Sequence, residues 1–307
     1  MILIHNCLYL CRRKISLKHL KTGWFHIFAL FVVIVWGTTF VSTKLLLFHG
    51  LSPGSIFMYR FVLAYAGVWF FERRQWFAGS IKDEFLLMLM GVTGGSLYFI
   101  AENSALGITL ASNVSLLVCT APILTAVFSR LFLKNEKFNR YLWQGSLLAL
   151  TGVAFIAFNG RFILQIKPLG DILSLIAALS WAFYTILLKR IENRYSTLFI
   201  IRKVFFYGII TLLPSFLLQP LDMDATVLMQ PVVWGNLLYL GIVASLLCYF
   251  LWNTVVKNLG AVRAINYVYL IPLVTLLTSV MVINETITWM AMAGALLILG
   301  GVVLAEQ

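Results

Sequence analysis

Apolar residues along this chain fall in runs of about 20 positions, long enough for a helix to cross the hydrocarbon core of a bilayer. The runs lack the apolar–polar alternation of membrane barrel strands, and backbone groups in lipid must be satisfied within the segment itself. We therefore predict an all-α integral membrane protein with ten transmembrane helices. The predicted spans are residues 24–48, 53–71, 84–103, 109–133, 141–158, 170–188, 197–218, 232–256, 262–283 and 286–305.

Composition argues against a soluble fold and against a nucleic-acid binder. Of the 307 residues, 61% are apolar and only 11% are charged, against about 25% charged in soluble domains. The net charge of +12 would suit nucleic acid if the basic residues formed one patch. They lie instead between the apolar runs, so the predicted partner is the lipid bilayer, and no nucleic acid is expected.

The basic residues also predict which way the chain faces. Residues 1–21, interpreted as a cytoplasmic leader, and every second loop carry lysine or arginine. The intervening loops are nearly bare of charge, with only Arg161 and Lys167 between the halves and only the acidic Asp222 and Asp224 in the longest loop. By the positive-inside rule, both termini are expected in the cytoplasm, in a multi-pass protein of a bacterial plasma membrane. The basic loop residues are Arg73, Arg74, Lys82, Lys134, Lys137, Arg140, Lys189, Arg190, Arg194, Lys257 and Arg263.

The sequence of the first half recurs in the second. Leu106-Gly107 is followed six positions later by Asn113, and Leu259-Gly260 is followed six positions later by Asn266. Because each half holds five helices, an odd number, the second half enters the membrane with opposite orientation, which gives an inverted repeat. The other matched pairs are Trp36 and Trp181, Lys44 and Lys189, Phe57 and Phe199, Arg60 and Arg202, Pro122 and Pro272, Glu136 and Glu285, Gly145 and Gly294, and Gly152 and Gly301.

These repeated motifs resemble those of the drug/metabolite transporter superfamily, in its EamA-type, ten-helix form. The first half carries Trp36-Gly37-Thr38-Thr39-Phe40 and Arg60-Phe61, and the second carries Trp181-Ala182-Phe183-Tyr184. The two EamA-like halves cover residues 24–158 and 170–305. The second half departs from the pattern at Ala182, where the first has Gly37.

The resemblance implies a secondary transporter with a central cavity between the two halves and alternating access. Members move amino acids, other small metabolites or drugs, often outward, so an exporter of small metabolites such as amino acids is expected. The fifth and tenth helices would lie at the periphery, as packing elements or as contacts in a homodimer. Three alternatives stay open: a nucleotide-sugar or sugar-phosphate exchanger, an integral-membrane enzyme, and a non-transporting scaffold.

No feature of the sequence predicts an enzyme, a metal or a cofactor. The four histidines are scattered, and no nucleophile elbow, P-loop or zinc-protease motif occurs. Cys119 and Cys248 fall within apolar runs, where packing explains them. Cys7 and Cys11 lie one helical turn apart near a basic stretch, and metal binding or lipidation there stays an open alternative.

Ionisable residues inside the predicted spans are candidates for gating or coupling, since charges in the membrane are costly. Lys44, Arg60 and Glu102 are expected near the external mouth. Their repeat counterparts Lys189, Arg202 and Asn253 are expected near the cytoplasmic end. We hypothesise that Glu102 pairs with Arg60 or Lys44 when the outer gate is shut, and that its carboxylate couples transport to a proton. The alternative is a static ion pair or snorkelling side chains.

Aromatic and amide residues near the middle of the membrane are candidates for the substrate cavity, which needs an apolar lining with a few polar groups. An alternative is that the aromatics face lipid or neighbouring helices, and that the amides form interhelical hydrogen bonds. The candidates are Trp36, Tyr98, Asn113, Trp181, Tyr184, Tyr249, Asn253, Asn266 and Tyr269.

Prolines and glycines within the spans predict local helix geometry. Pro122 and Pro272 each remove a backbone donor and are expected to kink the fourth and ninth helices, either for gating or as static kinks. The glycines of the fifth and tenth helices recur at seven-residue spacing and predict close packing. Glu136 and Glu285, just before those helices, are interpreted as structural, since a carboxylate is favourable at a helix N-terminus.

Overall fold

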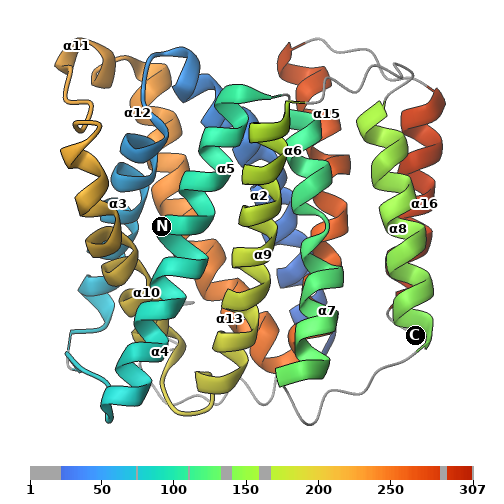
Figure 1. The fold of residues 1–307 in the computed structure, drawn as a ribbon, viewed down its shortest axis with the longest axis horizontal. Coiled ribbons are helices and arrows are strands. Elements are labelled where there is room, and N and C mark those ends of the chain that lie inside the picture. Colours follow the sequence, from blue (N-terminus) through green and yellow to red (C-terminus); the bar gives the residue numbers. More distant parts are fainter. Residues whose placement is uncertain are drawn as a thin grey trace.

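In the computed structural model the described residues are helical, without a strand, and the helices run side by side as one bundle (Figure 1). The leader with Cys7 and Cys11, and the glutamates Glu136 and Glu285, lie outside the described residues. The structure describes residues 22–73, 75–109, 111–132, 140–158, 167–283 and 289–305.

Each of the ten predicted spans has a helical counterpart, which confirms the all-α membrane fold class. The first-half elements are α2 (Thr22–Phe48), α3 (Pro53–Phe71), α4 (Ile81–Gly91), η2 (Val92–Ser96), α5 (Leu97–Ile108), α6 (Ala111–Val118), α7 (Ala121–Phe132) and α8 (Arg140–Phe158). The second-half elements are α9 (Pro168–Ile191), α10 (Thr197–Leu212), η3 (Leu213–Leu217), α11 (Ala225–Leu228), α12 (Pro231–Leu238), η4 (Tyr239–Leu247), α13 (Cys248–Leu259), α14 (Ala261–Asn266), η5 (Tyr267–Leu270), α15 (Ile271–Ile283) and α16 (Trp289–Ala305).

Within the described residues, six helical stretches are long and apolar enough to cross a membrane, judged by length and composition. Shorter apolar helices account for other predicted spans. The six stretches are Gly23–Phe48, Pro53–Phe71, Ile81–Ile108, Pro168–Ile191, Thr197–Leu217 and Pro231–Leu259.

The two prolines predicted to kink helices each lie in the first turn of a new helical segment. Pro122 is the second residue of α7, which follows a turn at Cys119 and Thr120. Pro272 is the second residue of α15, which follows the 3₁₀ segment η5. A proline is tolerated in a first turn because the N–H that it lacks has no intrahelical partner there. Each proline predicted to kink a helix therefore lies where one helical segment gives way to the next.

The packing pattern is preserved when the two halves are exchanged. Helix α2 packs on α13 and α15, and its counterpart α9 packs on α5 and α7. Likewise α3 packs on η4, and its counterpart α10 packs on η2. Two further contacts join an element to its own counterpart, α3 with α10 and α8 with α16. This is the arrangement that an inverted repeat produces.

Helices α8 and α16 form a pair at one edge of the bundle (Figure 1), as the family resemblance implied for the fifth and tenth helices. Their backbones meet at the predicted glycines. A Cβ on Gly152 would lie 2.5 Å from the Gly294 carbonyl oxygen, and one on Gly301 would lie 2.6 Å from the Gly145 carbonyl oxygen. The prediction of close packing at these glycines is confirmed.

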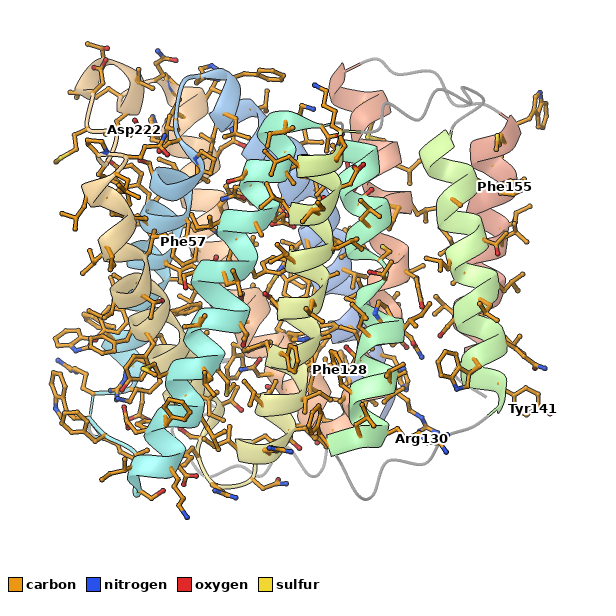
Figure 2. The ribbon with its side chains drawn as sticks, viewed as in Figure 1. Phe57, Phe128, Arg130, Tyr141, Phe155 and Asp222 are labelled. Carbon is orange, nitrogen blue, oxygen red and sulfur yellow. The ribbon has the colours of Figure 1, made fainter. Side chains whose placement is uncertain are left out.

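The two ends of the bundle differ in charge. Arg130 and Tyr141 lie at one end and Asp222 at the other (Figure 2). We call the end where α3, α7, α9 and α13 finish the basic end, because Arg73, Arg194 and Lys257 lie in or beside the connections there. The end that carries Asp222 is called the acidic end. By the positive-inside rule, the basic end corresponds to the predicted cytoplasmic side.

Two π-helical segments interrupt the third and eighth predicted spans at equivalent places. Segment η2 ends two residues before Tyr98, in the pair Tyr98-Phe99, and segment η4 ends two residues before Tyr249, in the matching pair Tyr249-Phe250. A π turn widens the helix and leaves carbonyl groups without their usual i+4 partner. Such segments occur often at functional sites.

Each π segment gives one carbonyl to an aromatic donor from the other half. The Trp36 indole Nε1 donates to the Ala244 carbonyl oxygen at 3.1 Å, and the Tyr249 hydroxyl donates to the Gly94 carbonyl oxygen. A buried carbonyl without a partner is costly. These two hydrogen bonds therefore offset the irregular backbone and at the same time fix the two halves against each other.

Glycine at position 94 also leaves room for the ring of Tyr184 from the other half. A Cβ on Gly94 would lie 2.3 Å from Cδ2 of Tyr184, a distance that side-chain atoms do not tolerate. The next residue, Gly95, departs from helical dihedral angles, with φ −129° and ψ −105°. The widened turn and the tyrosine ring of the opposite half thus occupy the space that a side chain would need.

We predict that Gly94→Ala destabilises the protein by roughly 1–3 kcal/mol, because the added methyl group overpacks the contact with Tyr184. Thermal unfolding of the detergent-solubilised protein measures this loss. The matched control is Gly107→Ala, since a Cβ on Gly107 meets nothing within 4 Å. That helical substitution is expected to stabilise by up to about 1 kcal/mol. Equal unfolding temperatures for the two variants would contradict the assigned close contact.

Candidate functional site

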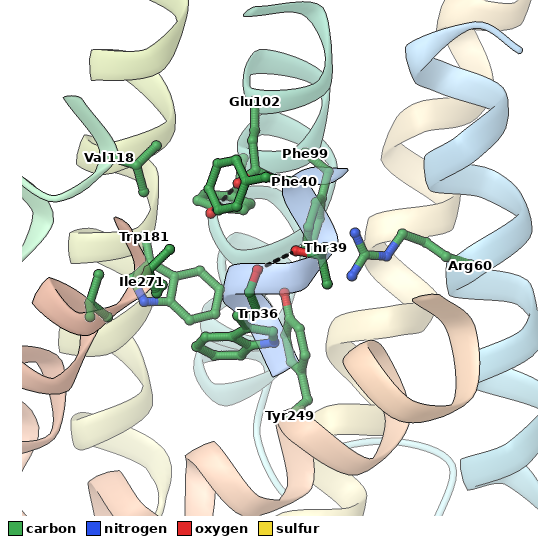
Figure 3. Close-up of a pocket in the computed structure, with 12 residues that line it drawn as sticks. Trp36, Thr39, Phe40, Arg60, Phe99, Glu102, Val118, Trp181, Tyr249 and Ile271 are labelled. Atoms are coloured by element: carbon green, nitrogen blue, oxygen red, sulfur yellow. Dashed lines mark hydrogen bonds between the residues drawn. The ribbon is translucent and has the colours of Figure 1, made fainter. Parts of the chain in front are cut away.

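A small cavity lies in the middle of the bundle, between the two halves (Figure 3). Its walls come from α2, α3, α5 and α6 of the first half and from α9, α13, η5 and α15 of the second. The space open to the centre of a water molecule is about 30 Å³, which holds about two waters. The lining residues are Trp36, Thr39, Phe40, Arg60, Tyr98, Phe99, Glu102, Val118, Trp181, Tyr249, Val268 and Ile271.

Aromatic rings from both halves form one side of the cavity. The Trp36 ring meets the Trp181 ring edge to face, with centroids 5.1 Å apart, and meets the Trp252 ring with centroids 5.0 Å apart. The Trp181 ring also contacts Tyr98 at 5.1 Å and Tyr184 at 5.0 Å. Packed rings of this kind lose little conformational freedom on binding a ligand. They give the cavity one rigid, apolar wall.

Arg60 is buried at the cavity wall, with 2% of its surface exposed. Its guanidinium carbon lies 4.1 Å from the centroid of the Phe99 ring, and its Nε donates to the Ser245 hydroxyl at 3.0 Å. That is the one hydrogen bond of Arg60 in the described part of the chain. The side chain extends from α3 into the cavity (Figure 3), so its outer N–H groups face the space where a ligand would bind.

Glu102 supplies a carboxylate to the same cavity. It is 6% exposed and accepts a hydrogen bond from the Tyr98 hydroxyl at 2.8 Å. The expected ion pair with Arg60 is not formed in this structure. The guanidinium lies over the Phe99 ring and bonds to Ser245, while one turn of helix places Tyr98 beside Glu102.

Several other predicted residues lie outside the cavity lining. The Tyr184 hydroxyl donates to Oδ1 of Asn253 at 2.7 Å, and the Tyr184 ring contacts the ring of Trp181. Asn266 and Tyr269 are buried in α14 and η5. Asn113 lies in α6, on the first-half element that packs against α9. Lys44 is partly buried on α2, about two helical turns beyond Trp36 toward the acidic end.

The structure adds residues that were not among the predicted cavity residues. Thr39 and Phe40 follow Trp36 by three and four positions, so helical spacing alone would have placed them beside it. Phe99 sits next to Tyr98 in the repeated Tyr-Phe pair. Val118, Val268, Ile271 and Ser245 carry no signal in the sequence, because apolar and small residues occur throughout the spans.

At the basic end, ion pairs and hydrogen bonds join the two halves. Asp83 pairs with Arg194 and accepts from the Tyr195 hydroxyl at 2.9 Å, while Glu84 pairs with Lys203. We call these contacts, together with those of Arg202 below, the basic belt. Each of them links an element of the first half to one of the second.

The repeat counterparts Lys189 and Arg202 also lie at the basic end, apart from the central cavity. Lys189 pairs with Glu192 at 2.8 Å on the last turn of α9. Arg202 donates to the backbone carbonyl oxygens of Glu72, at 2.5 Å, and of Gln75. Arg202 therefore holds the connection after α3 against α10 and completes the basic belt.

At the acidic end, Asp222 joins the long loop of the second half to the start of α3. Its carboxylate accepts from the Ser52 backbone N–H at 2.6 Å, and its own N–H donates to the Ser55 hydroxyl at 2.9 Å. The Tyr59 hydroxyl donates to its carbonyl oxygen at 2.5 Å. We call this set the acidic clip. Partial burial alone would raise the pKa of Asp222, but the hydrogen bonds from Ser52 and Ser55 hold it below its ordinary value.

Belt and clip together join the halves at both ends, and the cavity between them is too small for a metabolite. A sequence profile described as the EamA-like transporter family matches the chain twice, over residues 23–158 and 168–306. The chain belongs to the EamA-like transporter family. It is thus a transporter by family, with a multi-helix membrane fold.

Relatives of this EamA-like protein are named as transporters. An "Uncharacterized transporter" of Archaeoglobus fulgidus is 28% identical over 91% of this chain and 96% of the relative. A "Probable amino-acid metabolite efflux pump" of Salmonella typhimurium is 29% identical, over 89% of this chain and 91% of the relative. The protein of the same name in Escherichia coli is 27% identical, over 90% and 92%.

A solved crystal structure shares the fold of the EamA-like chain. It superposes with a TM-score of 0.72 over 92% of this chain and 98% of the other, at 17% sequence identity. At this identity the likeness shows the fold alone. Residue roles in the cavity must therefore be argued from the contacts of this chain.

We predict that Asp222→Ala lowers the unfolding temperature by about 2–4 °C, as expected for loss of hydrogen bonding worth about 1 kcal/mol. The matched control is Asp224→Ala, which removes only a local cap on Thr226. Because the folded pKa of Asp222 is depressed, its stabilisation is present above about pH 3.9, the unfolded value, and is lost as pH falls through the folded value. The extra acid sensitivity should be absent from Asp222→Ala and present in the control.

Proposed function

We propose that this protein is a secondary transporter that exports small metabolites, amino acids foremost, by alternating access through the central cavity. The observation that carries the proposal is the cavity itself. It lies between the two halves and combines aromatic walls with one buried guanidinium and one buried carboxylate. The names of two relatives, each called a "Probable amino-acid metabolite efflux pump", favour the same substrate class.

The polar groups of the cavity match the two ends of a zwitterion. The Arg60 guanidinium presents N–H groups in a planar fork that suits a carboxylate. The Glu102 carboxylate suits an ammonium group, and aromatic faces such as those of Trp36 and Trp181 attract a cation or an apolar side chain. An α-amino acid carries the matching carboxylate, ammonium group and side chain within a few ångströms of one another.

A sugar phosphate or nucleotide sugar fits these groups less well. A phosphate group carries one to two negative charges at neutral pH, and Glu102 would repel it within the same small cavity. Phosphate sites use clustered cations or helix N-termini. The lining holds one guanidinium, and the basic residues of the belt already bind carboxylates and carbonyls of the other half.

The closed state of both ends supports alternating access. About 30 Å³ of open space cannot admit an amino acid, so the cavity must widen toward one side at a time. Opening the acidic clip while the basic belt holds would expose the cavity at the acidic end, and the reverse would expose it at the basic end. We infer that the basic end faces the cytoplasm, in a multi-pass protein whose termini are both on that side.

Glu102 is the residue that we propose to couple transport to protons. Protonation would remove its attraction for an ammonium group and shift the hydrogen bond with Tyr98. A carboxylate that binds either the substrate or a proton makes the two compete, and this competition is enough for exchange. Its repeat counterpart Asn253 carries no charge, so coupling would occur on one side of the pseudo-two-fold axis.

We predict that vesicles containing the purified protein take up labelled amino acids when a proton gradient is imposed. Arg60→Gln should reduce saturable uptake at least tenfold, because the carboxylate of the substrate loses its partner. Arg73→Gln is the matched control, since Arg73 is exposed at the basic end. Flux of sugar phosphates in place of amino acids would contradict the substrate class, and no flux of any solute would contradict transport.

Glu102→Gln tests whether proton coupling can be lost while substrate exchange persists. We expect it to abolish the response of transport to a pH gradient while leaving exchange between internal and external substrate measurable. The control is Asp224→Asn, at an exposed loop position. A pH response in Glu102→Gln equal to that of the unaltered protein would exclude Glu102 as the coupling group.

A further inference from the structure

Five buried polar side chains between the cavity and the basic end have an atom without a hydrogen-bond partner in the described part of the chain. None of the five is more than 2% exposed. Residues of this kind ordinarily find partners when buried. The atoms are Thr125 Oγ1, Ser129 Oγ, Trp252 Nε1, Asn253 Nδ2 and Asn266 Nδ2.

These residues lie on elements that pack together. Thr125 and Ser129 are one turn apart on α7, Trp252 and Asn253 are on α13, and Asn266 ends α14. Helix α7 packs on α14 and on α9, and α13 packs on α14. We call the five residues the inner polar cluster.

The cluster spans the distance from the cavity to the basic end. Asn253 lies six residues before the end of α13, and Asn266 lies five residues after the start of α14. At 1.5 Å per residue, both are about 8–9 Å from that end. Ser129 is closer to it, three residues before the end of α7. At the other limit, the Trp252 ring is 5.0 Å from Trp36 of the cavity wall.

The repeat shows that a threonine at the position of Thr125 can find hydrogen-bond partners. Thr125 corresponds to Thr275 in the second half, when Pro122 is matched with Pro272. The Thr275 hydroxyl donates to the carbonyl oxygens of Gly37, at 2.9 Å, and Ile271, at 3.0 Å. Its counterpart Thr125 makes no such bond. An unsatisfied group is tolerated in one state when another state hydrates it.

We propose that the inner polar cluster lines the second half of the transport passage, between the cavity and the basic end. In the present structure this passage is shut. When the basic belt separates, water and the polar groups of a substrate take up the free hydrogen-bonding atoms of the cluster. The proposal rests on the proposed transport function and assigns residues to a path that the cavity alone does not define.

Cysteine accessibility tests the passage directly. Cys7, Cys11, Cys119 and Cys248 are first replaced by serine or alanine. Single cysteines are then placed at Thr125, Ser129 and Asn253, and a membrane-impermeant methanethiosulfonate is applied to sealed vesicles. Asn193→Cys marks the basic face and Met223→Cys the acidic face, since both positions are exposed.

We expect the three cluster cysteines to react from the side on which Asn193→Cys reacts, at least tenfold faster than Thr254→Cys. Thr254 is the matched control because it is equally buried on α13 and its hydroxyl bonds within its own helix, to the Phe250 carbonyl oxygen at 2.8 Å. Reaction only from the Met223→Cys side, or at the rate of Thr254→Cys, would overturn the proposal.

An apolar isostere provides a second test that does not need a cysteine. In a static core, Thr125→Val removes an unpartnered hydroxyl and should leave transport unchanged. In a passage that must hydrate, it stabilises the closed state, so the unfolding temperature rises or stays constant while the maximal transport rate falls severalfold. Thr185→Val is the control, since its hydroxyl bonds to the Trp181 carbonyl oxygen at 2.9 Å.

The two tests also separate this inference from the proposed function. Labelling needs no substrate, so accessible cluster cysteines in a protein without amino-acid flux would keep the passage and reject the substrate class. Amino-acid flux with inaccessible cluster cysteines, and with Thr125→Val transporting as the unaltered protein does, would keep the function and reject the passage.

Discussion

The structure depends on two hydrogen bonds that cross between its halves, from Trp36 to the Ala244 carbonyl oxygen and from Tyr249 to the Gly94 carbonyl oxygen. In lipid, a carbonyl released by a widened helical turn has no water to bond. The irregular backbone is stable only while the opposite half supplies a donor. The same two aromatic residues form walls of the cavity, so the constraint that joins the halves also shapes the site.

The remaining cross-half contacts lie at the two ends of the bundle. The basic belt and the acidic clip consist of charged and polar groups, and several of them, including Arg202 and Lys203, are buried in this closed structure. Polar groups of this kind can exchange their partners for water when an end opens. Under the proposed alternating access, the ends would separate while the buried centre holds the two repeats in register.

Much of this architecture could be predicted from the sequence, because span length and loop charge follow from the bilayer itself. The span predicted at residues 53–71 has the observed bounds of α3. The third, predicted at 84–103, extends from Ile81 to Ile108, because the helix continues through polar residues at both ends of the apolar run. Trp36 is predicted for the cavity, whereas Arg60 and Glu102 are predicted near the external mouth, from the cost of placing charges in the membrane, and lie in the cavity wall instead. Ser245 as the partner of Arg60, and the absence of an Arg60–Glu102 pair, depend on the π segments, which no periodicity in an all-apolar run reveals.

The π segments set the angular phase of the site. A π turn holds about one residue more than an α turn, and one residue advances the helix by roughly 100°. Every side chain after η2 and η4, including Tyr98, Glu102, Tyr249 and Asn253, is therefore rotated relative to a regular helix. In an unbroken α-helix the face that now meets the cavity would point toward a neighbouring helix or the lipid. The proposed transport site is, in this sense, a consequence of two matching phase shifts along the helices.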